Sequence, residues 1–166
     1  MSGSKSFPGV DPGRRRNMQA NQSRDTKPEM QVRKLLHAGG YRYVTHERTL
    51  PGKPDIVFPA KRKIVEVRGC FWHGHGCSPL GLMPKSRTEY WEPKIAATKA
   101  RDIRNEVALQ EKGWQVLNVW ECVVRGDKGE LKALLSDFLG PPRTPKSLKG
   151  DRSAVHPISS VPYLSD

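Results

Sequence analysis

The sequence is poor in cysteine, poor in acidic residues and without any long hydrophobic run. Its three cysteines, Cys70, Cys77 and Cys122, are odd in number, which argues against the disulfide framework of a secreted domain. No apolar run approaches the ~20 residues that a membrane-spanning helix needs, and no stretch like a signal peptide begins the chain. These absences predict a soluble, cytoplasmic protein without a membrane partner.

The deficit of acidic residues leaves a large positive charge. Lys and Arg number 29 against 17 Asp and Glu, so the 166-residue chain has a formal net charge of +12. Such an excess favours a polyanionic partner, of which nucleic acid is the commonest, with an anionic membrane surface as the rival. The length allows one domain with a real core, and the hydrophobic content of 36% indicates that part of the chain does not pack.

Composition divides the chain into three parts. Residues 1–25 have the composition of a flexible basic arm, in which Arg14, Arg15 and Arg16 are consecutive. Such an arm either follows DNA phosphates or a groove, or is a solvated tail. Residues 26–140 carry the patterns of a folded domain. Residues 141–166 include five prolines, lose apolar periodicity and are predicted to be disordered.

The folded part alternates between helical and extended patterns. Thr26 and Glu29 form a capping-box pattern that opens a helix, which Gly39–Gly40 ends. Strands are predicted at 41–45, 55–58, 63–67 and 115–120, a long helix at 88–112 and a closing helix at 131–139. One side of the long helix carries Trp91, Ile95, Ile103 and Val107. The order α, β, β, β, α, β, α predicts a mixed α/β domain with a small central sheet flanked by helices.

Asp55, Glu66 and Arg68 form a candidate catalytic cluster. Residues two apart on a strand share a face, and a hairpin between 55–58 and 63–67 brings Asp55 to the end where Glu66 and Arg68 lie. Carboxylates hold Mg²⁺, the metal activates water, and a cation offsets the charge that develops on a phosphodiester. The pattern of Pro-Asp, spacer and acid-x-base is shared with the restriction-endonuclease-like nucleases. A surface salt bridge is the simpler reading of the same acid-x-Arg pair.

The segment GCFWHGHGC, residues 69–77, carries the strongest metal-binding pattern. Cys70, His75 and Cys77 are ligands that zinc prefers, and the interspersed glycines let the backbone turn tightly around an ion. Structural zinc takes four ligands, and Cys122 is the one cysteine left, just after the strand that ends at Trp120. The spacing differs from the two close pairs of an ordinary zinc finger, and buried thiols without metal are the alternative.

Three other side chains of this segment have open roles. His73 either acts as a general acid or base beside the carboxylates, or replaces His75 as the zinc ligand. Phe71 and Trp72 are adjacent aromatics on a glycine-rich loop. They belong either to a core or to a wedge that stacks into a duplex.

Five blocks of the sequence resemble the very short patch repair (Vsr) DNA mismatch endonucleases in order and spacing. The blocks are RNMQANQSRDTKPE (16–29), LPGKPDIVF (50–58), GCFWHGHGC (69–77), RTEYWEPKI (87–95) and GWQVLNVWEC (113–122). The resemblance covers roughly residues 16–139. It implies a restriction-endonuclease-like fold with a structural zinc, and a Mg²⁺-dependent nick on the 5′ side of the T in a T·G mismatch. Such mismatches arise when 5-methylcytosine deaminates.

The resemblance also implies residue roles. Asp55 would be the central Mg²⁺ ligand together with the backbone carbonyl of Val67, Glu29 would orient metal-bound water, and His73 would be the catalytic histidine. The zinc ligands would be Cys70, His75, Cys77 and Cys122. The aromatics that enter double-stranded DNA beside the mismatch would be Phe71, Trp72 and Trp91, while the basic arm embraces the duplex from the far side. Family members work as monomers alongside mismatch-repair proteins.

One strand departs from the best-known pattern of that family. Glu66 and Arg68 stand where the pattern has an aromatic residue and a second active-site histidine. Arginine cannot act as a base near neutral pH, but it can hold a phosphate. The departure leaves two alternatives to the mismatch endonuclease: a nicking or restriction-type nuclease with another DNA target, and a zinc-stapled DNA-binding protein without catalysis.

Overall fold

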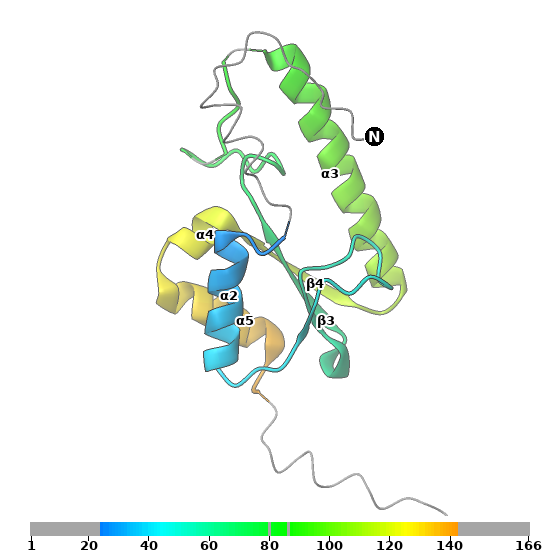
Figure 1. The fold of residues 1–166 in the computed structure, drawn as a ribbon, viewed down its shortest axis with the longest axis vertical. Helices are drawn as coiled ribbons and strands as arrows, with labels where there is room; N and C mark the ends of the chain where they lie inside the picture. The colour runs from blue at the N-terminus through cyan, green and yellow to red at the C-terminus, as the bar shows by residue number, and fades with distance from the viewer. Residues whose placement is uncertain (1–23, 80, 86, 143–166) are drawn as a thin grey trace, which may run out of the picture.

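The computed structural model describes residues 24–79, 81–85 and 87–142. Within this range it has a four-stranded sheet and helices on both of its faces (Figure 1). Most of the basic arm lies outside the described residues, including Arg14, Arg15 and Arg16; only its last two residues are described. The tail from residue 143 also lies outside them. Among the described helices, none combines the length and apolar character that crossing a bilayer requires.

The sheet has the strand order β1-β2-β3-β4. Strand β1 (Val44–Thr45) pairs antiparallel with β2 (Ile56–Phe58), and β2 pairs antiparallel with β3 (Lys63–Arg68). A 3-10 turn, Pro59–Lys61, connects β2 to β3. Strand β4 (Gln115–Trp120) lies parallel to β3 and pairs with all six of its residues, from Lys63↔Gln115 to Arg68↔Trp120. The predicted hairpin is therefore confirmed.

Four helices cover the sheet. In Figure 1, α2 (Lys27–Ala38), α4 (Glu121–Arg125) and α5 (Lys128–Leu139) lie on one side of β3 and β4, while the long α3 (Thr88–Glu111) runs along the other. The capping box that opens α2 is present, with Glu29 N donating to Thr26 Oγ1 and Thr26 N donating to Glu29. Arg33, four residues after Glu29, also holds the Glu29 carboxylate.

Each face of the sheet buries its own core because side chains alternate along a strand. One core joins Val65 and Val119 of the sheet to Leu36 of α2 and Leu135 of α5, all at most 1% exposed. The opposite core is smaller and joins Val57 and Ile64 to Leu109 of α3 and to Trp114. The predicted alternation along β3, with Ile64 on one face and Val65 on the other, is confirmed.

The order of elements matches the prediction, with three local differences. The strand predicted at 41–45 is reduced to Val44–Thr45, and α4 adds a short helix between β4 and α5. The inward side of α3 also differs, since Ile103 and Val107 are 64% and 46% exposed. The inward stripe instead carries polar residues, Asp102, Asn105 and Glu106, followed by buried Leu109. Hydrophobic periodicity predicts the wrong inward side for α3, because the inward residues in this part of the helix face a polar cleft.

Candidate active site

A cleft of about 1440 Å³ brings together the side chains predicted to be catalytic. It is bordered by the first turn of α2, the segment before β2, the end of β3, the loop that follows, and α3. The predicted residues that line it are Glu29, Asp55, Glu66, Val67, Arg68, Trp72 and His73. Four elements distant in sequence thus contribute to one site.

Asp55 lies where the pairing between β2 and β3 stops. The last pair toward that end is Ile56↔Val65, and beyond it the Val67 N–H donates to the Asp55 carboxylate at 2.9 Å. Burial, and then the negative charges of Glu29 and Glu66, raise the pKa of Asp55 to about 7 against the opposing hydrogen bond from Val67. A carboxylate whose charge is disfavoured by burial and by two neighbouring acids fits a site for a divalent cation.

Glu66 and Arg68 lie together on β3, as their spacing predicts. Arg68 donates through Nε and Nη2 to Glu66 Oε2 at 3.1 and 2.8 Å, and its Nη2 lies 3.5 Å from Glu106 Oε2 on α3. Arg68 is 9% exposed, so this ion pair is not the surface salt bridge that the simpler reading expects. Two carboxylates hold the guanidinium on the wall of the cleft.

Glu29 is buried, at 2% exposure, and is held by a second arginine. Arg33 donates to Glu29 and also, at 2.6 Å, to Asp25. Arg33 Nη2 lies 2.7 Å from His46 Nε2. A guanidinium only donates, so His46 accepts through Nε2 and carries its proton on Nδ1. Asp25, Glu29 and His46 are close enough to ligate an ion, but the Arg33 cation already lies among them.

His73 is oriented by a carboxylate that the sequence reading missed. Its Nδ1 lies 2.5 Å from Asp102 Oδ2 on α3, and Arg101 approaches the other oxygen of Asp102 at 3.5 Å. An Nδ1–H that donates to Asp102 leaves the Nε2 lone pair free to exchange a proton. His73 thus faces the carboxylate side of the cleft, away from the cysteines.

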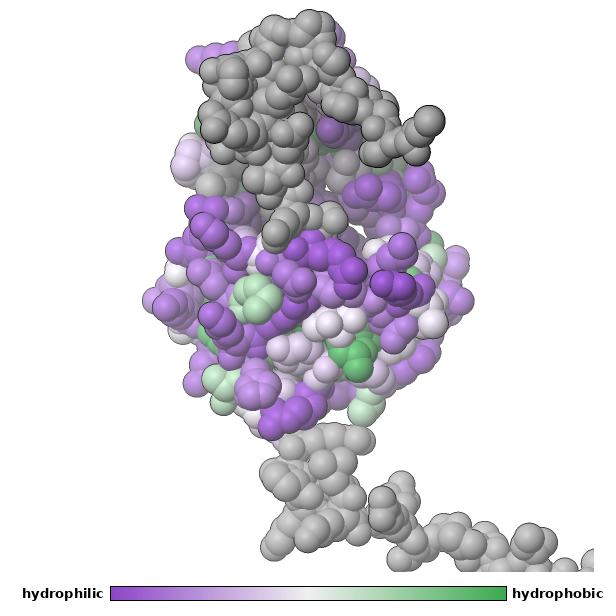
Figure 2. Space-filling model, in the orientation of Figure 1, coloured by the Kyte–Doolittle hydropathy of each residue, from purple (hydrophilic) through white to green (hydrophobic). Residues whose placement is uncertain are grey.

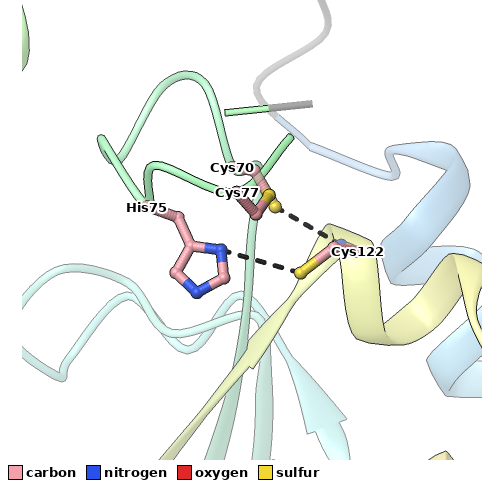
Figure 3. Close-up of side chains that lie close together, drawn as sticks. All are labelled: Cys70, His75, Cys77 and Cys122. Atoms are coloured by element: carbon pink, nitrogen blue, oxygen red, sulfur yellow. Dashed lines mark hydrogen bonds between the residues drawn. The ribbon is translucent and has the colours of Figure 1, made fainter. Parts of the chain in front are cut away.

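The cysteines gather around His75. Cys70, His75, Cys77 and Cys122 place their ligand atoms within 4.8 Å of one another, and Cys122 Sγ lies 3.6 Å from His75 Nδ1 (Figure 3). Burial, with contributions from the neighbouring thiols, raises the pKa of Cys70 to about 12. Three thiols and an imidazole in this arrangement fit a tetrahedral zinc site, because a bound divalent cation favours the thiolate.

Local backbone geometry explains how the segment 69–77 places His73 in the cleft and His75 among the cysteines. Gly74 and Gly76 adopt positive φ angles of +61° and +76°, which reverse the chain on either side of His75. His75 then stacks on Trp120 at 4.2 Å, at the end of β4 and two residues before Cys122. This stack brings the loop beside the end of β4, which is where the predicted zinc link would join the two.

The predicted aromatics form one cluster next to the cleft. Phe71 lies 5.0 Å from Trp72 and 5.1 Å from Trp91, measured between ring centroids. Two further side chains join them: Tyr90 lies 5.0 Å from Trp91, and the Lys94 ammonium lies 5.5 Å from the Trp91 ring. Trp72 also lines the cleft, so the aromatic cluster reaches the cleft that the carboxylates line.

Basic side chains surround the same cleft. Those that line it are Arg24, Lys27, Arg48, Lys53, Arg101 and Arg125. The described surface in Figure 2 is largely hydrophilic, with small separated apolar areas. A phosphate backbone lying over the cleft would therefore meet cations around a carboxylate-lined floor.

Comparison with known proteins decides the family. A type II nicking enzyme of Xanthomonas oryzae pv. oryzae is 53% identical over 133 residues, covering 80% of this chain and 96% of the relative. The DNA mismatch endonuclease Vsr of Escherichia coli is 43% identical over 113 residues, covering 68% of this chain and 72% of the relative. The chain belongs to the Vsr family. The family model, described as DNA mismatch endonuclease Vsr, matches residues 10–79.

Membership of the Vsr family confirms the resemblance and the expectation of an endonuclease family acting on DNA. A second nicking enzyme, from Neisseria meningitidis serogroup A, is 45% identical over 103 residues, covering 62% of this chain and 73% of the relative. The family model ends at residue 79, whereas Asp102, Glu106 and Cys122 lie beyond it. The contacts of these three residues come from the structure.

Proposed function

We propose that this Vsr-family protein is a Mg²⁺-dependent endonuclease that nicks one DNA strand on the 5′ side of the T in a T·G mismatch left by deaminated 5-methylcytosine. The observation that carries the proposal is the cleft itself. Asp55, His73 and Asp102 line it together with Trp72, which belongs to the aromatic cluster. A cluster that reads the duplex next to a hydrolytic centre is what strand cleavage beside a mismatch requires.

Asp55 and the Val67 carbonyl are the proposed magnesium ligands. Mg²⁺ prefers hard oxygen donors. Burial and neighbouring negative charge raise the pKa of Asp55, so a bound cation would stabilise its ionised form. Glu29, fixed by Arg33 and its helix cap, would orient water at that site. When bound, the metal would supply a Lewis acid beside the scissile phosphate.

His73 is the proposed general base. With Nδ1 directed to Asp102, its Nε2 accepts a proton from the attacking water as the new P–O bond forms and the leaving oxygen is expelled. Asp102 stabilises the imidazolium that results. In this chain Arg68 cannot take the place of a second histidine as a base.

Zinc is the proposed occupant of the site formed by Cys70, His75, Cys77 and Cys122. It would tie the loop after β3 to the start of α4, and so fix the position of His73, which lies between two of the ligands in sequence. We also propose a restriction-endonuclease-like core. The arrangement that supports it is an antiparallel β2–β3 hairpin with the acids at its end and a parallel β4 beside it.

DNA recognition is assigned to the aromatic cluster and to basic side chains. Phe71, Trp72 and Trp91 would enter the duplex beside the mismatch, where an apolar wedge unstacks bases. Arginines 14–16 would contact phosphates from the opposite side, as the sequence analysis expects of the arm. The protein would act as a monomer, in reach of mismatch-repair proteins.

A nicking assay on matched duplexes tests the proposal. Zinc-loaded protein and Mg²⁺ are mixed with two labelled duplexes that differ at a single position, T·G in one and C·G in the other. The expected result is a nick 5′ to the T in the T·G duplex alone. Equal cutting of both duplexes would point to a nuclease with another DNA target. Binding without any cutting would point to a DNA-binding protein that lacks catalysis.

The alternative of another DNA target draws on one feature of the site. Glu66 and Arg68 form a partly buried ion pair where the best-known family pattern has an aromatic residue and a histidine. Two of the relatives compared above are named type II nicking enzymes rather than mismatch endonucleases. Digestion of a mixed-sequence plasmid, without mismatches, distinguishes this alternative because only it predicts nicks there.

A further inference from the structure

Glu106 lies toward the C-terminal end of α3 and joins a hydrogen-bonded set with residues that line the cleft. Its Oε2 accepts from Asn118 Nδ2 of β4 at 3.0 Å and lies 3.5 Å from Arg68 Nη2 of β3. Glu66 completes the set through its two hydrogen bonds from Arg68. Glu66 and Asn118 are direct partners in the β3–β4 register, so the four residues occupy one layer across strand, strand and helix.

The charges of this set do not cancel. Arg68 and Glu66 alone would form a neutral pair, and a neutral pair adds little attraction for a cation in the cleft. Glu106 supplies a second negative charge to the same guanidinium, so the three side chains carry a net negative charge. Arg68 is almost fully buried, so solvent screens these interactions less than it would at the surface.

The position of Glu106 on α3 also connects it to the general base. Asp102 and Glu106 are four residues apart and therefore lie on the same face of the helix. Asp102 holds His73, and Glu106 holds Arg68. A single helix thus positions side chains from both the end of β3 and the loop that follows it.

A purely stabilising role would not require these residue types. Replacing a buried ion pair by apolar residues of similar volume is often neutral or stabilising. The set also has a cost, since Asn118 Oδ1 is buried and has no hydrogen-bond partner among the described residues. Asn118 donates its side-chain N–H to Glu106 although its own Oδ1 stays without a partner. This indicates that the position of the Glu106 carboxylate is important for the site.

We propose that Glu106 is a positioning residue for divalent-cation binding in the cleft. By sharing Arg68, it prevents that guanidinium from neutralising Glu66, and Glu66 remains a negative charge beside the cation that Asp55 binds. Asn118 holds Glu106 in this position. The inference rests on the proposed function, because that function supplies the cation site at Asp55.

Two substitutions at Glu106 separate charge from shape. Glu106→Gln keeps the shape and removes the charge, whereas Glu106→Asp keeps the charge and shortens the side chain. Glu111→Gln is the matched control, since it removes the same charge from an exposed position of the same helix. Each full-length, zinc-loaded variant is titrated with Ca²⁺ by calorimetry, and the Mg²⁺ concentration for half-maximal nicking is measured. Melting temperatures are recorded for all three.

For Glu106→Gln we expect about a tenfold loss of Ca²⁺ affinity and a matching rise in the Mg²⁺ requirement, with an unchanged melting temperature. Glu106→Asp and Glu111→Gln should stay within about twofold of the unmodified protein. Unchanged cation affinity in Glu106→Gln would overturn the inference, whether or not the variant is less stable. If Glu106→Gln fails to fold, Glu106→Asp carries the test: Ca²⁺ affinity within about twofold of the unmodified protein is the expected result, and a loss of about tenfold would overturn the inference. An unmodified protein that neither binds Ca²⁺ nor nicks DNA would instead refute the proposed function.

Discussion

Replacing Asp55 by asparagine tests the charge balance of the cleft. The side chain of asparagine can still accept the hydrogen bond from Val67 N, so the substitution removes a charge and little else. The folded protein raises the pKa of Asp55 from 3.8 to about 7, chiefly through burial. An acid whose pKa is raised by folding favours the folded state at low pH and opposes it as the pH rises from the unfolded pKa to the folded one.

The magnitude follows from the shift in pKa. Each unit corresponds to roughly 1.4 kcal/mol, so the Asp55 charge costs the metal-free protein about 4 kcal/mol at pH 8. At pH 5 much of the carboxyl is still protonated in the folded state, and the cost is only about 2 kcal/mol. Asp55→Asn should therefore stabilise the metal-free protein, and its advantage should grow by about 2–3 kcal/mol between pH 5 and pH 8.

Urea denaturation at several pH values measures this advantage. Mg²⁺ is omitted rather than chelated, because a chelator would also strip zinc from the cysteine site. Asp137→Asn, which removes an exposed acid from α5, is the control and should show no such trend. Added Mg²⁺ should stabilise the unmodified protein and leave Asp55→Asn unchanged, while nicking by that variant is lost. A variant no more stable than the unmodified protein at pH 8 would refute the reasoning.

Three further substitutions test the other parts of the site. Cys122→Ala should abolish stoichiometric zinc and unfold the domain or lower its melting temperature sharply, because structural zinc contributes ~10 kcal/mol or more to folding; retained zinc, by elemental analysis, would contradict the four-ligand site. Asp102→Asn should lower the single-turnover nicking rate by about 100-fold or more at unchanged DNA affinity, since His73 loses its partner; an unchanged rate would remove Asp102 from the mechanism. Trp91→Ala should weaken binding to the T·G duplex by about 1–3 kcal/mol, measured by fluorescence anisotropy; an equal loss on matched DNA would show that Trp91 does not read the mismatch.

Local sequence signals predicted much of the fold. The capping box at Thr26, the β-branched run 63–67 and Gly113 each determine structure within a few residues, and the elements they predict are present. The alternation along β3 likewise placed Glu66 and Arg68 on one face beside Asp55. These inferences succeed because backbone geometry alone relates the residues concerned.

Partners from distant elements could not be predicted in the same way. Asp102 and Glu106 lie in a stretch of α3 that reads as a solvated helix face, with Ile103 and Val107 offered as the apolar side. Only the packing of Leu109 and Ile95 against the rest of the domain decides which stripe turns inward. Arg33 was missed for a related reason, since its three partners come from the residues just before α2, from the first turn of α2 and from the segment after β1. The one available signal was the (i, i+4) spacing from Glu29.

The inward stripe of α3 explains why its apolar residues face solvent. Trp91, Asp102 and Glu106 fall near multiples of 3.6 residues from one another, and so they share one face of the helix. The tryptophan reaches the aromatic cluster, while the two acids hold His73 and Arg68. These contacts, together with buried Ile95 and Leu109, occupy the inward side of α3, so Ile103 and Val107 turn outward. Because a helix of this length is rigid, the proposed DNA-reading cluster and the proposed cutting site would keep a fixed separation. Recognition through the aromatic cluster would then specify which phosphate reaches the carboxylates of the cleft.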